Sequence, residues 1–147
     1  MVPLIGQGGV VVGFAARALG DDHPKYLNSP ESAVFRKSSF VFALDQARRA
    51  LSQSGELVVV EGQFDAIALH QAGITHVVAT SGTALTAEHA RTFQRLVPRV
   101  ALTFDGDAAG RDATMRSIGV LLAAELEVSV VDLPPGRIRT RWCGAAG

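Results

Sequence analysis

From Gly55 onward, short apolar runs alternate with helical patterns, and this alternation restricts the possible folds more than any other feature of the sequence. The expected strands are residues 57–60, 74–80, 100–104 and 128–133. The expected helices are residues 65–72, 86–97 and 108–125. Residues 57–60 are continuously apolar, which is typical of a strand buried on both faces. Alternating elements with short links predict an α/β fold, a mainly parallel four-stranded sheet with helices on both faces.

The first 53 residues lack this alternation. Residues 2–5 and 10–14 flank a glycine-rich link and predict a β-hairpin, because glycine supplies the positive φ of tight turns. Residues 20–30 are rich in turn formers and predict irregular structure. Apolar residues at helical spacing between Phe40 and Leu51 predict a helix that ends before Gly55. We therefore expect a small hairpin and helix segment before the α/β domain.

Two acidic clusters follow directly on two of the predicted strands. Glu61 and Asp65 come after residues 57–60, and Asp105 and Asp107 come after residues 100–104. If these strands are neighbours, the four carboxylates converge at the carboxyl edge, where open α/β sheets bind their ligands. Ionised acids so close together repel one another unless a cation neutralises them, and oxygen ligands suit Mg²⁺ or Mn²⁺. The alternative is that Asp65 and Asp107 only cap helices and that Glu61 is a solvated strand end.

Composition limits the class of protein without identifying it. A chain of 147 residues can form one good core, and it contains no stretch of about 18 apolar residues that would cross a membrane. Its single cysteine fits a reducing cytoplasm. The net charge of zero combines a basic first part, six Lys and Arg against four Asp and Glu in residues 1–53, with an acidic remainder. Such a distribution can steer a polyanion toward a bound cation.

Several motifs together resemble the TOPRIM domain of bacterial DNA primases and the segment that precedes it. The TOPRIM-like motifs are residues 61–65, 81–86 and 105–113, which read EGQFD, SGTALT and DGDAAGRDA. The upstream stretches are residues 12–17, 24–31 and 35–37, which read VGFAAR, PKYLNSPE and FRK. The resemblance covers nearly all of residues 1–136. It divides the chain into a remnant of the N-terminal polymerase subdomain, residues 1–53, and a TOPRIM domain, residues 54–136.

The resemblance implies a catalytic core that uses Mg²⁺ or Mn²⁺ to join ribonucleoside triphosphates into short RNA primers on single-stranded DNA during replication. Glu61, Asp65, Asp105 and Asp107 match the acidic catalytic and metal site of the family, with Glu61 as a ligand or as a general acid or base. For a full-length member it also implies contact with the replicative helicase and a place in the bacterial cytoplasm at the nucleoid.

Three further residues match positions that the family uses for nucleotide or nucleic-acid contact. These are Arg17 and Lys25, with Asn28 in an assisting role. Residues 81–83 allow two readings: their backbone amides bind phosphate ahead of a helix, or they form a simple turn with Thr86 as the helix cap.

The sequence departs from the family at both ends. The zinc-binding and helicase-binding domains are missing, so we interpret the chain as a fragment. The family also has a third acidic motif, Asp-Pro-Asp after a glycine, whereas Gly136 here is followed by arginines at 137, 139 and 141. We expect residues 137–147 to be an aberrant, disordered tail, and the isolated chain to be nearly or wholly inactive.

Two other functions remain open on the sequence alone. Topoisomerases and some nucleases share the acidic fold, but a topoisomerase needs a tyrosine nucleophile and the only tyrosine here is Tyr26. The other alternative is a non-catalytic fragment that binds nucleotide or DNA without turnover.

The missing third motif leads to a first prediction. A variant in which Asp-Pro-Asp follows Gly136 will bind Mn²⁺ more tightly than this chain, because carboxylates replace the cationic arginine side chains near the metal. Isothermal titration of both chains measures the difference. Equal affinities would mean that the loss of the motif has no effect on metal binding.

Overall fold

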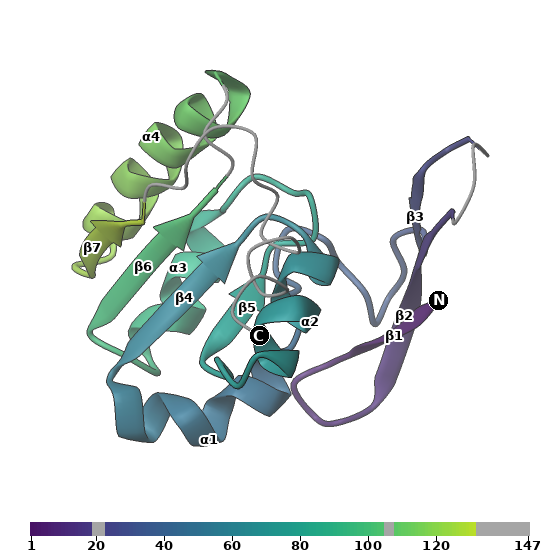
Figure 1. Ribbon diagram of the computed structural model, residues 1–147, viewed down its shortest axis with the longest axis horizontal. Coiled ribbons are helices and arrows are strands. Elements are labelled where there is room, and N and C mark those ends of the chain that lie inside the picture. The colour runs from purple at the N-terminus through teal and green to yellow at the C-terminus, as the bar shows by residue number, and fades with distance from the viewer. Residues whose placement is uncertain (19–22, 105–107, 132–147) are drawn as a thin grey trace.

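The computed structural model describes residues 1–18, 23–104 and 108–131, which form two sheets and four helices (Figure 1). A parallel sheet of order β5-β4-β6-β7 contains β4 (Glu56–Val60), β5 (Val77–Ala79), β6 (Arg99–Thr103) and β7 (Glu127–Val130). An antiparallel sheet contains β1 (Val2–Ile5), β2 (Val11–Arg17) and β3 (Tyr26–Asn28) in that order. The helices are α1 (Leu44–Ser54), α2 (Gln63–Gln71), α3 (Ala87–Gln94) and α4 (Ala108–Ala123). The predicted α/β fold is confirmed. No helix in the described part of the chain is long and apolar enough to cross a bilayer.

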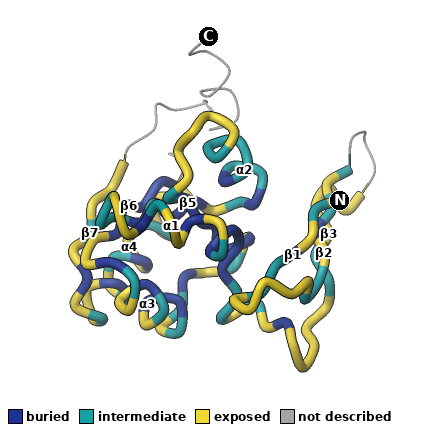
Figure 2. The backbone as a smooth tube through the Cα atoms, turned by 90° about the horizontal axis from the view of Figure 1, so that it is seen from below, coloured by how far each residue is buried: buried dark blue, intermediate teal, exposed yellow. Residues whose placement is uncertain are grey.

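Burial on both faces explains the continuous apolar run of β4. Leu57 and Val59 pack in one buried cluster with residues of α1, α3 and α4, whereas Val60 packs in a second cluster with Ala66 of α2. Figure 2 shows α2 on the opposite side of the parallel sheet from α3 and α4, with buried segments between them. A strand with one solvated face would instead alternate apolar and polar residues.

The antiparallel sheet contains the predicted hairpin and one strand that the sequence analysis missed. Residues 26–28 were expected to be irregular, but they form β3 and pair with the end of β2, with Tyr26 opposite Arg17. Pairing with β2 provides hydrogen-bond partners for the backbone N–H and C=O groups of these residues. This tertiary contact overrides the local preference of the sequence for turns. Leu4 and Ala15 face inward and pack in the same cluster as Ala66, which joins the small sheet to the α/β domain.

The helix that was expected to include Phe40 begins later. Phe42 forms an antiparallel bridge with Ala79 of β5, through N–H···O distances of 2.9 and 3.2 Å, so the chain is extended there. The predicted buried residues Leu44, Ala47 and Leu51 are confirmed, and the helix ends at Gly55 with a φ of 63°. The expected tail, residues 137–147, lies outside the described residues.

A hydrogen-bonded network around His89 ties the start of α3 to the segment before α1. The Thr86 N–H donates to His89 Nδ1 (3.1 Å), and the His89 N–H donates to Thr86 Oγ1 (3.2 Å). Because Nδ1 accepts a hydrogen bond, the proton is on Nε2, which donates to the Phe40 carbonyl at 3.1 Å. Desolvation by burial lowers the pKa of His89, and the hydrogen bond to the Phe40 carbonyl opposes this only in part. His89 is therefore a neutral, fully satisfied core residue.

The lowered pKa of His89 predicts a loss of stability in acid. The unfolded chain binds a proton near pH 6.5 that the folded chain does not, so this contribution is complete above pH 6.5 and shrinks as the pH falls toward the lowered pKa. Within that window, the free energy of unfolding should fall by up to about 1.4 kcal/mol per pH unit. Urea unfolding between about pH 7.5 and pH 5 measures the slope.

His89→Gln supplies the comparison for this experiment, with His23→Gln, at an exposed position, as the matched control. The His89→Gln variant should be less stable at neutral pH by about 1–2 kcal/mol, because a buried hydrogen-bonded group is replaced. Its stability should also depend less on pH. A slope as steep as that of the wild-type chain would contradict the role given to His89.

Candidate active site

The carboxyl ends of β4 and β6 lie side by side and form the centre of the candidate site. The two strands pair in parallel, with Val60 opposite Thr103, and Glu61 follows β4 directly. The helices that follow these strands, α2 and α4, cover opposite faces of the sheet, so the edge between them is a switch point of the kind that binds ligands. Asp105 and Asp107 lie outside the described residues, and the convergence of all four carboxylates stays a prediction.

Glu61 and Asp65 occupy different positions at this edge. Glu61 is exposed just beyond β4, whereas Asp65 is partly buried in the first turn of α2, where the positive end of the helix favours a carboxylate. The N-cap position belongs to Gly62, and Asp65 is the third residue of the helix. Its carboxylate instead folds back over Gly62: a Cβ added there would lie 2.9 Å from Asp65 Oδ2.

The oxygen donors of Glu61 and Asp65 are of the type that Mg²⁺ and Mn²⁺ prefer. Within the described ranges, no three His, Cys, Asp or Glu side chains gather closely enough to hold a metal. The donor chemistry of this pair fits a divalent cation, and further ligands would have to come from outside those ranges.

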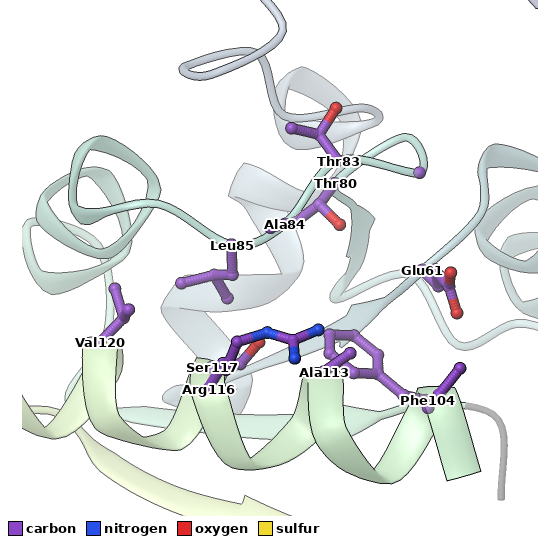
Figure 3. Close-up of a pocket in the computed structure, with 13 residues that line it drawn as sticks. Glu61, Thr80, Thr83, Ala84, Leu85, Phe104, Ala113, Arg116, Ser117 and Val120 are labelled. Carbon is purple, nitrogen blue, oxygen red and sulfur yellow. The ribbon is translucent and has the colours of Figure 1, made fainter. Parts of the chain in front are cut away.

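A cavity of about 500 Å³ opens beside Glu61, between the loop after β5 and helix α4 (Figure 3). The Arg116 side chain extends along it toward Phe104, and Glu61 stands at one end. Hydroxyl groups of Thr80, Thr83 and Ser117 and several apolar side chains complete the lining. The cavity provides room for part of a ligand next to the acidic edge.

Two amides of the turn at residues 81–83 donate to backbone carbonyls, which favours the turn reading of this motif over the phosphate-binding one. The Gly82 N–H donates to the Glu61 carbonyl (3.0 Å), and the Thr83 N–H donates to the Thr80 carbonyl (3.2 Å). Ser81 and Gly82 both have left-handed φ values, 61° and 71°. Thr86 caps α3 as expected. The turn therefore fixes the loop against the end of β4, and these two amides are not directed at a phosphate.

Arg17 and Asn28 lie at the seam between the small sheet and α2. The Arg17 guanidinium stacks over Tyr26 and Phe64, with Cζ 5.6 and 5.9 Å from the two ring centroids. The Gln63 side chain donates from Nε2 to Asn28 Oδ1 at 3.1 Å. Lys25 is exposed at the start of β3, and its carbonyl accepts from the Ala18 N–H. The structure thus brings Arg17 and Asn28 to the helix that carries Asp65.

Three residues of this seam received no role from the sequence: Tyr26, Gln63 and Phe64. Two of them lie inside the EGQFD motif, in which only the acidic residues were predicted to belong to the site. A predicted strand at residues 26–28 would have revealed the contact of Tyr26 with Arg17, because cross-strand pairing places these two residues next to each other.

Family models match both parts of the chain. Residues 58–137 match a model described as Toprim-like, and residues 1–48 match the N-terminal domain of the DNA primase catalytic core.

Curated relatives and solved structures agree with these matches. The chain is 45% identical over 138 residues to the DNA primase of Deinococcus radiodurans, covering 93% of this chain and 24% of that protein. It is 40% identical over 147 residues to a DNA primase of Staphylococcus aureus, covering 100% and 24%. The zinc-binding and RNA polymerase domains of Aquifex aeolicus primase superpose with a TM-score of 0.92 at 39% identity, covering 98% of this chain and 36% of that one. A DnaG primase catalytic domain bound to single-stranded DNA gives 0.90 at 36% identity, with coverage of 99% and 47%. The chain therefore spans about a quarter of the length of these curated relatives.

The close approach of Asp65 to Gly62 predicts a selective effect of Gly62→Ala. The backbone at Gly62 has a φ of −106° and a ψ of 149°, which alanine adopts freely, so the variant should fold, with a small loss of stability because alanine is a poorer N-cap than glycine. The new Cβ will displace the Asp65 carboxylate and weaken Mn²⁺ binding by about 10-fold.

Titration calorimetry and thermal melts measure both quantities. Gly8→Ala is the matched control, because a Cβ there meets nothing within 4 Å. Unchanged Mn²⁺ affinity in a folded Gly62→Ala variant would show that Asp65 is not a ligand.

Proposed function

This chain belongs to the Toprim-like family, among the catalytic cores of bacterial DNA primases, and on that premise we propose that it forms part of a primer-synthesising site. In a longer protein, this site joins ribonucleoside triphosphates into a short RNA on a single-stranded DNA template. The observation that carries the proposal is the parallel pairing of β4 with β6, because each strand runs directly into one of the two acidic motifs.

Toprim domains of primases use a divalent metal, and we assign its binding here to Glu61, Asp65, Asp105 and Asp107 as Mg²⁺ or Mn²⁺. When bound, the cation neutralises the triphosphate and makes the attacking 3′-hydroxyl more acidic. Asp65, which folds back over Gly62 in the first turn of α2, is one of these proposed ligands. Glu61 stands exposed at the strand end, where it can act as a ligand or exchange a proton with the reacting hydroxyl.

Arg17, Lys25 and Asn28 are the proposed contacts to nucleotide and nucleic acid. The planar guanidinium of Arg17 suits two phosphate oxygens at once, and the exposed Lys25 suits a phosphate of the template. Asn28 uses its carbonyl oxygen for Gln63, so the amide N–H groups are the donors that it can offer to a ligand. A solved relative bound to single-stranded DNA supports a DNA template. Contact with the replicative helicase and location at the nucleoid are proposed for the full-length protein.

The alternative of a DNA-breaking enzyme fits less well. The one tyrosine, Tyr26, packs its ring against Phe64 and Arg17, which gives it a packing role at the seam between the small sheet and α2. The non-catalytic alternative concerns the isolated chain, for which we expect nucleotide or DNA binding with little or no turnover.

A chimeric enzyme tests the proposed function. Residues 1–131 replace the matching segment of the Deinococcus radiodurans primase, and incorporation of labelled ribonucleotides on single-stranded DNA is measured with Mg²⁺ or Mn²⁺. The chimera should make primers, and Glu61→Gln should reduce the rate by about 100-fold or more, because it removes a charge that acts on the transition state.

Glu56→Gln is the matched control, since Glu56 is the first residue of β4, at the end of the strand away from Glu61. It should leave the rate unchanged. A folded chimera that cleaves the DNA template but makes no primer would favour the DNA-breaking alternative.

A further inference from the structure

Two aromatic rings hold one arginine at the seam between the two sheets. Arg17 is the last residue of β2, and its Cζ lies 5.6 Å from the centroid of Tyr26 and 5.9 Å from that of Phe64. The rings themselves are 6.2 Å apart and tilted by 49°. Both Arg17 distances fall within the range of attractive cation–π contacts. We call Arg17, Tyr26 and Phe64 the arginine clamp.

The two rings come from different parts of the fold. Tyr26 lies on β3 directly opposite Arg17, so the two side chains share one side of the small sheet. Phe64 is the second residue of α2, one position before Asp65. The clamp therefore fixes an arginine of the small sheet relative to the helix turn that carries a proposed metal ligand. The neighbouring Gln63–Asn28 hydrogen bond reinforces the same junction.

Aromatic rings fix a guanidinium without neutralising it. No carboxylate in the described part of the chain forms a salt bridge with Arg17, although Arg36 has one with Glu88. A carboxylate partner would compete with an incoming phosphate, whereas ring faces leave the in-plane N–H donors available. Arg17 is exposed and Tyr26 is 53% exposed, so a ligand can reach the cation.

We infer that Tyr26 and Phe64 are positioning residues that hold the Arg17 guanidinium for the triphosphate of the incoming nucleotide. This inference rests on the proposed function, because it takes the triphosphate as the ligand of Arg17. It assigns a role to Phe64 of the EGQFD motif: Glu61 and Asp65 are the proposed cation ligands, and Phe64 holds an arginine beside the helix turn that carries Asp65.

A double-mutant cycle with GTP and Mn²⁺ as the probe tests the inference in the 147-residue chain. Phe64→Leu and Tyr26→Leu remove a ring and keep an apolar side chain, and each should weaken GTP binding by about 2- to 5-fold. In an Arg17→Gln background the same changes should have no further effect, because their action passes through Arg17. Phe64→Tyr keeps a ring and should bind as the wild-type chain does.

Phe14→Leu is the matched control, since Phe14 is a half-exposed aromatic residue on the opposite face of the same strand. It should not change GTP affinity. Wild-type affinity in folded Phe64→Leu, or an equal loss with and without Arg17, would overturn the inference and leave the proposed function intact.

The Arg17 Nε–Hε resonance gives a second, independent readout. The ring faces should shift it upfield in the wild-type chain, and Phe64→Leu or Tyr26→Leu should reduce that shift, while Phe14→Leu should not. If the wild-type chain binds no GTP, the proposed function fails for this chain. The Arg17 Nε–Hε resonance then tests the arginine clamp without GTP. A chemical shift that does not change when either ring is removed would overturn the inference.

Discussion

Five paired positions join β4 to β6 in parallel, from Glu56 opposite Arg99 to Val60 opposite Thr103, and the rest of the site depends on this register. Because parallel strands end at the same edge, Glu61 and Phe104, the residues that follow β4 and β6, lie at one edge of the sheet. The pairing is possible only because both faces of β4 are covered, one by α1, α3 and α4 and the other by α2 and the small sheet. A shift of one residue would exchange the side chains that pack in the two clusters and would move the end of β4 out of line with the end of β6.

The first turn of α2 joins the acidic edge to the rest of the molecule. Consecutive residues of this turn make different contacts. Gln63 and Phe64 contact the small sheet, and the Asp65 side chain folds back over Gly62. The small sheet has little core of its own, since Leu4 and Ala15 are its buried contribution to the shared cluster. Its polar and aromatic contacts with α2 therefore determine where Arg17 and Asn28 lie relative to the acids. This division explains why a short motif can serve both the cation and the packing of two sheets.

Sequence patterns predicted the α/β part well because its determinants are local. The apolar run at 57–60, Gly55 at a helix end and Thr86 at a helix start all act through neighbouring residues. The errors lie where distant segments supply the partners. Residues 26–28 are a strand because β2 is there to pair with, and Phe42 is extended because Ala79 accepts and donates its hydrogen bonds. The acids at 61 and 65 were identified from their place after a strand, whereas Tyr26, Gln63 and Phe64 were not.

By itself, the sequence determined the class of fold, the position of the acidic motifs after two strands and the family to which the motifs belong. These properties depend on hydrophobic periodicity, motif spacing and residue type, which can be read directly from the sequence. Only the tertiary structure decided that β4 and β6 are neighbours, that the Gly82 and Thr83 amides donate to backbone carbonyls, and that Arg17 contacts two aromatic rings. Each of these facts needs two segments far apart in sequence to meet. Contacts between distant segments form because they bury the apolar core as a whole, and a local sequence pattern does not predict them.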